Sequence, residues 1–161
     1  MGTDVRKLVR DGYPAANVLG CDLRLEYIEL GHALFGDTPA SSPIRFFTAN
    51  VFDLPVESPR SGTSTTAAAG DLGPGAGTAV TDLAQLRGAL THVYTGALFH
   101  LFNEDAQRAL ALRLAVLLRR EPGAVVFGRH QGLEEAGVID DHLGRYVRAH
   151  ARARLLLPAC L

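Results

Sequence analysis

A chain of 161 residues suits one globular domain, and its 47% hydrophobic and 20% charged residues are ordinary for such a domain. The formal net charge of −1 provides no bulk attraction to nucleic acid or to an anionic membrane, so neither is expected as a partner. Two cysteines are too few for a disulfide framework or a metal cage. Without a long apolar run or a signal-peptide pattern, we expect a cytoplasmic protein.

The first part of the chain predicts helices and strands in alternation. The expected elements are a helix over 4–10, a strand over 18–22, a helix over 23–35 and a strand over 44–49. Each predicted helix has apolar residues three or four positions apart, and each predicted strand is a short run of apolar, aromatic or β-branched residues. Pro14 blocks continuation of the first helix, and Gly36 suits the C-terminal cap of the second.

Residues 55–81 have a different composition, rich in Pro, Gly, Ser, Thr and Ala and without an apolar period. This composition predicts a disordered insertion, because it cannot repay the entropy of ordering. The glycines between Gly73 and Gly77 do not form a phosphate-binding loop, since no strand precedes them and Pro74 lacks the N–H that such a loop uses.

Ordered structure is expected again from Asp82. The elements predicted there are a strand over 89–95, a helix over 104–120 and a strand over 124–127. Asn103 is placed to cap the helix, with Arg119 and Arg120 at its negative end. The pattern weakens after Gly132, although residues 143–154 could form a basic helix.

This alternation predicts an α/β fold in which a parallel sheet has helices on both faces. Ligands of such folds bind beyond the carboxyl ends of the strands. Three places in the sequence meet that condition, and they are Asp22, Asn50 and residues 95–97.

Each of the two polar residues has two interpretations. The Asp22 carboxylate could accept hydrogen bonds from a ribose diol, or it could cap the helix that follows. The Asn50 amide could pair with an adenine edge, or it could be an ordinary turn residue. Because both follow neighbouring strands, together they favour a nucleoside site at the strand ends.

Other candidates for chemistry are weaker. His100, which follows the strand predicted at 89–95, could act as a general base, although packing beside Leu101 and Phe102 is the favoured interpretation. Cys21 is expected to be packed in its strand and not nucleophilic. No metal site is expected, because the Asp140–His142 run has no further ligand at a suitable spacing.

Several motifs, in order, resemble the fungal class I S-adenosylmethionine-dependent methyltransferases of secondary-metabolite pathways. The motifs that carry the resemblance are Val5–Leu8, Val18–Arg24, Phe46–Asp53, Phe99–Glu104 and Pro122–Arg129. The resemblance extends over residues 2–150 apart from the insertion. It implies a Rossmann-like sheet, S-adenosyl-L-methionine as the cofactor and a small-molecule acceptor.

The resemblance also assigns roles to individual residues. It implies that Asp22 binds the ribose with Leu23 beside the adenine, and that Asn50 contacts the adenine with Val51 adjacent. Thr95 and Gly96 correspond to the strand that opens beside the methyl donor. His100 corresponds to a family histidine to which we assign no role.

The sequence departs from the family at both ends. Gly2–Asp4 matches only the tail of the family's Gly-rich turn, so we expect a domain over 1–150 that is truncated at its start. The central first strand and the terminal hairpin are expected to be absent, and residues 151–161 form an unassigned tail. The leading hypothesis is methylation of a hydroxyl or carboxyl oxygen, with this chain inactive by itself. The alternatives are a non-catalytic nucleoside-binding or scaffold module and a nicotinamide oxidoreductase. This sequence lacks the Gly-x-Gly-x-x-Gly motif expected of the oxidoreductase.

Overall fold

Helices and strands alternate along the chain, as the sequence predicts. A computed structural model of the chain describes residues 2–57 and 79–130. The helices and strands in those ranges are α1 (Thr3–Arg10), β1 (Leu19–Asp22), α2 (Leu25–Phe35), β2 (Arg45–Thr48), β3 (His92–Gly96), α3 (Glu104–Leu117) and β4 (Val125–Arg129). Single 3₁₀ turns connect several of them: η1 (Ala15–Asn17), η2 (Val51–Asp53), η3 (Leu83–Leu86) and η4 (Phe99–Leu101).

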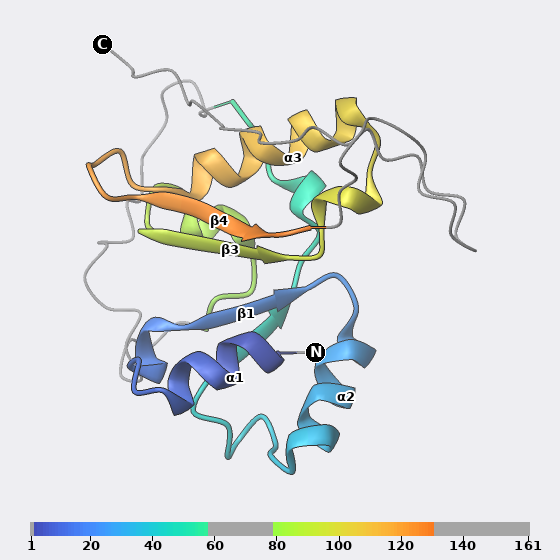
Figure 1. Cartoon of the computed structure of the whole chain (residues 1–161), viewed down its shortest axis with the longest axis vertical. Coiled ribbons are helices and arrows are strands. Elements are labelled where there is room, and N and C mark those ends of the chain that lie inside the picture. Colours follow the sequence, from blue (N-terminus) through green and yellow to red (C-terminus); the bar gives the residue numbers. More distant parts are fainter. Residues whose placement is uncertain (1, 58–78, 131–161) are drawn as a thin grey trace.

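The four described strands form two separate parallel pairs. β1 pairs with β2 from Leu19 opposite Arg45, and β3 pairs with β4 from His92 opposite Val125. The two pairs are not hydrogen-bonded to each other. In Figure 1 β1 faces β3, and the labelled strands all point the same way, so their carboxyl ends lie on one side of the molecule. The fold is therefore mixed α/β with small parallel sheets.

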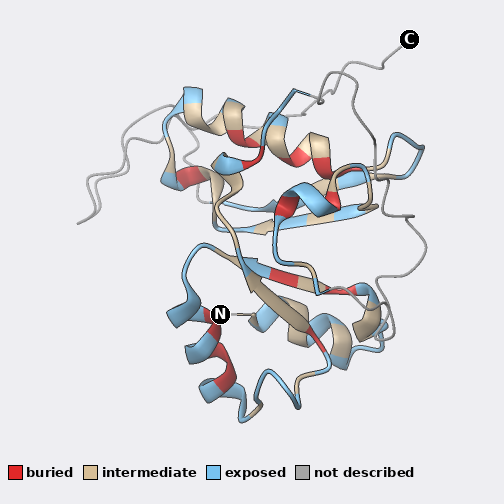
Figure 2. Ribbon diagram, turned by 180° about the vertical axis from the view of Figure 1, so that it is seen from behind, coloured by how far each residue is buried: buried red, intermediate tan, exposed pale blue. Residues whose placement is uncertain are grey.

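A leucine core lies between α3 and the β3–β4 pair and extends toward β2. Its buried members are Leu54, Leu83, Leu86, Leu110, Leu114 and Leu117. Half-buried residues from both strand pairs pack against it, including Phe47 from β2 and Val93 from β3. Figure 2 shows the buried side of α3 turned toward the strands and the exposed side turned to solvent. This core therefore joins the two strand pairs even though their backbones are not paired.

Capping side chains fix the helix ends largely as predicted. Asn103 accepts a hydrogen bond from the Ala106 N–H at 3.0 Å, which confirms it as the cap of α3. Gly36 ends α2 in the left-handed conformation, at φ 67°, which only glycine adopts without penalty. The 3₁₀ turn η3, which the sequence analysis did not predict, begins with a capping box between Asp82 and Gln85.

The predicted end of α3 is wrong by three residues. The helix stops at Leu117 because Leu118 leaves it to form a parallel bridge with Leu90. The Arg119 guanidinium donates to the Ala89 carbonyl at 3.1 Å, so we correct its predicted place at the negative end of the helix. The residues before His92 consequently form a loop with one bridge, where a strand was predicted from Ala89.

A partly buried polar cluster joins α1 to the end of α2. Arg6 donates to both carboxylate oxygens of Asp37, at 3.1 and 2.9 Å, and His32 hydrogen-bonds the same carboxylate. The Arg6 guanidinium also lies over the rings of Phe35 and Phe46, 4.7 and 4.8 Å from their centroids. These contacts, together with a buried Ile28, hold the helices against the β1–β2 pair.

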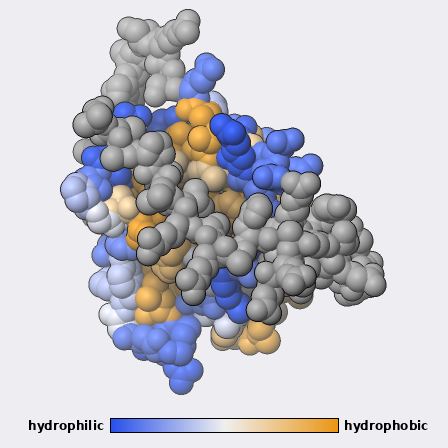
Figure 3. All heavy atoms as spheres, turned by 45° about the horizontal axis from the view of Figure 1, so that its top comes forward, coloured by the Kyte–Doolittle hydropathy of each residue, from blue (hydrophilic) through white to orange (hydrophobic). Residues whose placement is uncertain are grey.

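Parts of the predicted organisation lie outside the described residues. They are most of the 55–81 insertion, the basic segment 143–154 and the 151–161 tail. Within the described ranges, no helix has the length and apolarity needed to cross a membrane. Hydrophobic residues nevertheless reach the surface, and Figure 3 shows them gathered between hydrophilic flanks on one face.

Candidate functional site

The carboxyl ends of the strands form one rim of the molecule, where the sequence analysis expects a ligand. Asp22 ends β1, Asn50 follows β2, and Gly96 ends β3. The N-terminal end of the described chain lies at the same rim, beside the end of β1 in Figure 1. The predicted residues are therefore brought to one side of the fold by the parallel arrangement of the strands.

Asp22 is half-buried and uses one carboxylate oxygen locally. Its Oδ1 accepts a hydrogen bond from the Arg24 N–H at 3.0 Å, which closes the turn between β1 and α2. It does not cap α2, whose N-cap is Arg24 without a side-chain bond. The other oxygen, Oδ2, has no hydrogen-bond partner within residues 2–57 and 79–130. A carboxylate in this state can still accept bonds from a ligand.

Asn50 is engaged in the turn that follows β2. Its Oδ1 accepts from the Phe52 N–H at 3.1 Å, and its Nδ2 donates to Asp53 Oδ1 at 3.1 Å. The structure therefore places Asn50 in a turn, and its contact with an adenine stays a prediction. An amide has two donor hydrogens and two acceptor lone pairs, so each end of Asn50 retains one that is unused by these bonds.

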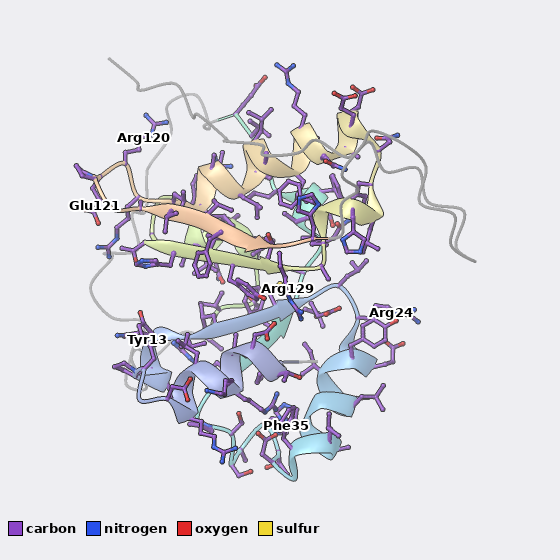
Figure 4. The ribbon with its side chains drawn as sticks, in the orientation of Figure 1. Tyr13, Arg24, Phe35, Arg120, Glu121 and Arg129 are labelled. Carbon is purple, nitrogen blue, oxygen red and sulfur yellow. The ribbon has the colours of Figure 1, made fainter. Side chains whose placement is uncertain are left out.

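Asp4 connects the start of α1 to the other strand pair, a contact that the sequence analysis missed. The Tyr94 hydroxyl donates to Asp4 Oδ2 at 3.0 Å, and the Arg129 guanidinium lies 3.9 Å from the same oxygen. Figure 4 shows Arg129 in the space between the β3–β4 pair and β1. These residues are 90 or more positions apart from Asp4, so no local pattern could have indicated that they meet.

The backbone at the end of β3 is unusual. Ala97 has φ 56°, in the left-handed region that a side chain disfavours, and its N–H donates to the Arg129 carbonyl at 2.7 Å. Gly96 leaves room for its neighbours, since a Cβ there would lie 3.1 Å from the Tyr94 hydroxyl and 3.4 Å from Asp4. A Cβ at Gly128 would overlap the Thr95 carbonyl on the paired strand. Strained and crowded backbone of this kind is common at ligand sites.

The remaining predicted rim residues differ in their surroundings. Gly2 caps α1 with φ 80°, and a Cβ there would overlap Arg6 and approach Phe46. Leu23 is 66% exposed, which leaves its side chain accessible to a ligand. Val51 instead packs against the leucine core, and Thr95 is half-buried within β3.

Two other sequence candidates have clear positions. His100 is buried, with 7% of its surface exposed, as the packing interpretation expects. Cys21 is an exposed residue, so its predicted packing is wrong. Desolvation by its surroundings nevertheless raises the pKa of its thiol to about 11, which disfavours the nucleophilic thiolate. Within the two described ranges, no three His, Cys, Asp or Glu side chains gather as a metal site would require.

A cavity of about 380 Å³ lies beside α2 and β2. Its lining includes Ile28 and His32 of α2, Ile44 just before β2, and Phe46 and Thr48 of β2. Neither Asp22 nor Asn50 lines it. The polar atoms at the rim therefore come from the ends of separate strands and not from the lining of this cavity.

Comparisons with known proteins give consistent names. The chain is 33% identical over 128 residues to methyltransferase adrK of Penicillium rubens, which covers 80% of this chain and 37% of that protein. It is 29% identical over 147 residues to the asnovolin E/chermesin D methyltransferase nvfJ of Aspergillus novofumigatus, with 91% and 44% covered. It is 28% identical over 137 residues to O-methyltransferase phiE of a fungal species, with 85% and 37% covered.

These matches extend over most of this chain, but the chain spans less than half the length of each of those three relatives. No family model matches the sequence. No solved structure matches it either.

Proposed function

Because this chain is a homologue of fungal methyltransferases of secondary-metabolite pathways, we propose that it forms part of an S-adenosylmethionine-dependent methyltransferase. We propose a small natural product as the acceptor, methylated on a hydroxyl or carboxyl oxygen. The observation that carries the proposal is the placement of Asp22 at the end of β1, on the same rim as Asn50 and Gly96.

The hydrogen-bonding groups at this rim fit a nucleoside. Asp22 Oδ2 is available to accept hydrogen bonds from a ribose diol, and the exposed Leu23 beside it offers an apolar contact for a base. Asn50 retains one donor and one acceptor for the edge of an adenine. Val51 belongs to the core and so acts through its backbone or by supporting Asn50.

Gly2, Thr95 and Gly96 would border the methionine part of the cofactor. When bound, S-adenosylmethionine supplies an electrophilic methyl group. Gly96 keeps space open beside Asp4, whose carboxylate is oriented by the Tyr94 hydroxyl and faces Arg129. Methyl transfer is an in-line displacement, so the main contribution of these residues is to position the reactants. His100 is too buried to be assigned as a base, and we leave it without a catalytic role.

The separation of the strands into two pairs supports the proposal that an additional strand lies between β1 and β3. Within the described ranges, no backbone hydrogen bonds join β1 to β3, which face each other, and one additional parallel strand would pair with the facing edges of both. We place the central strand of a Rossmann-like sheet there, supplied by residues of a longer chain.

The alternative is a nucleoside-binding or scaffold module without catalysis. It is favoured by the facing edges of β1 and β3, which are not paired with each other in the described chain. Strands without pairing would hold the rim residues loosely, and a small misplacement of the reacting atoms can reduce the rate about a hundredfold.

The experiment compares this chain with a version extended by the coding residues upstream of Met1. Both are assayed for S-adenosylhomocysteine formation with a panel of phenolic and carboxylic acceptors. We expect turnover from the extended version and none from the 161-residue chain. Equal turnover from both would refute the requirement for an added strand, and no turnover from either would favour the non-catalytic module.

A further inference from the structure

Two opposite charges lie side by side where α1 approaches the β3–β4 pair. Asp4 is in the first turn of α1, and Arg129 is the last residue of β4. The Arg129 guanidinium lies 3.9 Å from Asp4 Oδ2, and the two side chains are 76% and 52% exposed. Figure 4 shows Arg129 in the space between the β3–β4 pair and β1. An exposed ion pair with so long a separation adds little to stability, so a purely structural role explains it poorly.

Both charged groups retain most of their hydrogen-bonding capacity. Asp4 Oδ2 accepts a bond from the Tyr94 hydroxyl, whereas Asp4 Oδ1 has no hydrogen-bond partner within residues 2–57 and 79–130. Within the same ranges, the guanidinium of Arg129 makes no hydrogen bond, and its approach to Asp4 is its polar contact. A guanidinium has five N–H donors, and a carboxylate has about four acceptor positions. A ligand that carries an anionic and a cationic group could therefore bind to both residues.

The backbone beside the two charges holds them in place and leaves space between them. The Arg129 carbonyl accepts a bond from the Ala97 N–H at 2.7 Å, and Ala97 forms it in the left-handed region, at φ 56°. A Cβ at Gly96 would lie 3.1 Å from the Tyr94 hydroxyl and 3.4 Å from Asp4. The disfavoured conformation thus fixes the end of β4, and the glycine keeps Asp4 accessible.

We propose that Asp4 and Arg129 bind an amino-acid zwitterion, with the Asp4 carboxylate accepting bonds from its ammonium group and the Arg129 guanidinium donating to its carboxylate. We call these two residues the zwitterion site. Opposite charges in contact suit a zwitterion, whereas a simple carboxylate would be repelled by Asp4 and a simple amine by Arg129. The inference rests on the proposed function, because S-adenosylmethionine carries such a zwitterion at the end of its methionine chain.

The zwitterion site lies on the same side of the strands as Asp22. Side chains alternate along a strand, so Asp22 shares the face of β1 on which Gly20 lies. Phe46 packs against Gly20, and the Arg6 guanidinium of α1 lies over the Phe46 ring. Asp4 belongs to the same helix and reaches across to the β3–β4 pair. A cofactor with its ribose at Asp22 would therefore reach the zwitterion site by extending its methionine chain from β1 toward β3.

The test is calorimetric titration of the upstream-extended chain with two ligands. S-adenosylhomocysteine carries the zwitterion, whereas 5′-methylthioadenosine keeps the nucleoside and the thioether but has no amino acid. We expect Asp4→Asn and Arg129→Gln each to bind S-adenosylhomocysteine about tenfold or more weakly, and to bind 5′-methylthioadenosine as the wild type does. The matched controls are Asp11→Asn, at the far end of α1, and Arg120→Gln, an exposed residue before β4. Neither control should change either affinity.

A third ligand separates the roles of the two charges. S-adenosylhomocysteine without its carboxylate keeps only the ammonium group, so Asp4→Asn should weaken its binding and Arg129→Gln should not. A loss of affinity for 5′-methylthioadenosine equal to that for S-adenosylhomocysteine would show that a variant had disturbed the fold, and would overturn the proposal. Wild-type affinity no greater for S-adenosylhomocysteine than for 5′-methylthioadenosine would also overturn it but would leave the nucleoside site in place. If neither ligand bound the wild type, the proposed function would fail together with the zwitterion site.

Discussion

Residues 2–57 and residues 79–130 each contain a parallel strand pair, but they are stabilised differently. The second region is built on leucines of α3 and η3, with Leu110 completely buried. The first region has fewer buried apolar side chains and uses the Arg6–Asp37–His32 cluster to hold its helices. Apolar packing loses stability when volume is removed, whereas a polar cluster depends on charge and therefore on pH. The two regions should respond to different perturbations.

The largest expected effect is in the leucine core. Leu110→Ala removes side-chain volume at a position with no exposed surface, which should lower the free energy of unfolding by about 2–5 kcal/mol. Leu112→Ala, on the exposed side of the same helix, should change it by less than about 0.5 kcal/mol. Urea unfolding of the two variants and the wild type measures both changes in the free energy of unfolding. Similar losses of stability from the two substitutions would contradict the claim that apolar packing stabilises residues 79–130.

A smaller effect is expected in the polar cluster. Asp37→Asn removes the charge that accepts two hydrogen bonds from Arg6, and should lower stability by about 1.5–3 kcal/mol at neutral pH. The matched control is Asp11→Asn, which breaks an exposed ion pair with Lys7 and should lower stability by about 0.5 kcal/mol or less.

The contribution of Asp37 should also depend on pH. Hydrogen bonds from Arg6 hold the pKa of Asp37 below its ordinary value of 3.8, so the folded state releases this proton more readily than the unfolded state. The stability it provides is therefore complete above pH 3.8 and is lost as the pH falls through and below that value. The difference between wild type and Asp37→Asn should narrow in that range. A difference independent of pH would show that shape, and not charge, holds the cluster.

The elements of both regions could be predicted because their causes are local. The Asn103 side chain caps the start of α3, and Gly36, which has no side chain, ends α2. Each determines its helix end within a few residues. The early end of α3 could not be predicted, because the bridge between Leu90 and Leu118 competes with the helix across a distance of 28 positions in sequence. Propensity alone would have continued the helix.

The site was predicted only in outline. The rule that ligands bind at strand ends selected Asp22 and Asn50, and the structure places both at the rim. It could not indicate that Asp4 would meet Tyr94 from the other strand pair. That contact depends on how the core brings the two strand pairs together, which is a property of tertiary packing, whereas the bond between Asn50 and Asp53 is local to one turn.

The most direct test of the account is calorimetric titration of S-adenosylhomocysteine into the upstream-extended chain and its Asp22 variants. Asp22→Ala removes both the turn contact to Arg24 and the proposed ribose acceptor, while Asp22→Asn keeps an oxygen for the turn but loses the charge. Asp11→Ala, a loss of charge at the far end of α1, is the control. We predict that both Asp22 variants bind about tenfold or more weakly, a loss of about 1.5–3 kcal/mol, and that the control binds normally. Wild-type affinity in Asp22→Asn would contradict the account, since Asp22 would then serve only the turn.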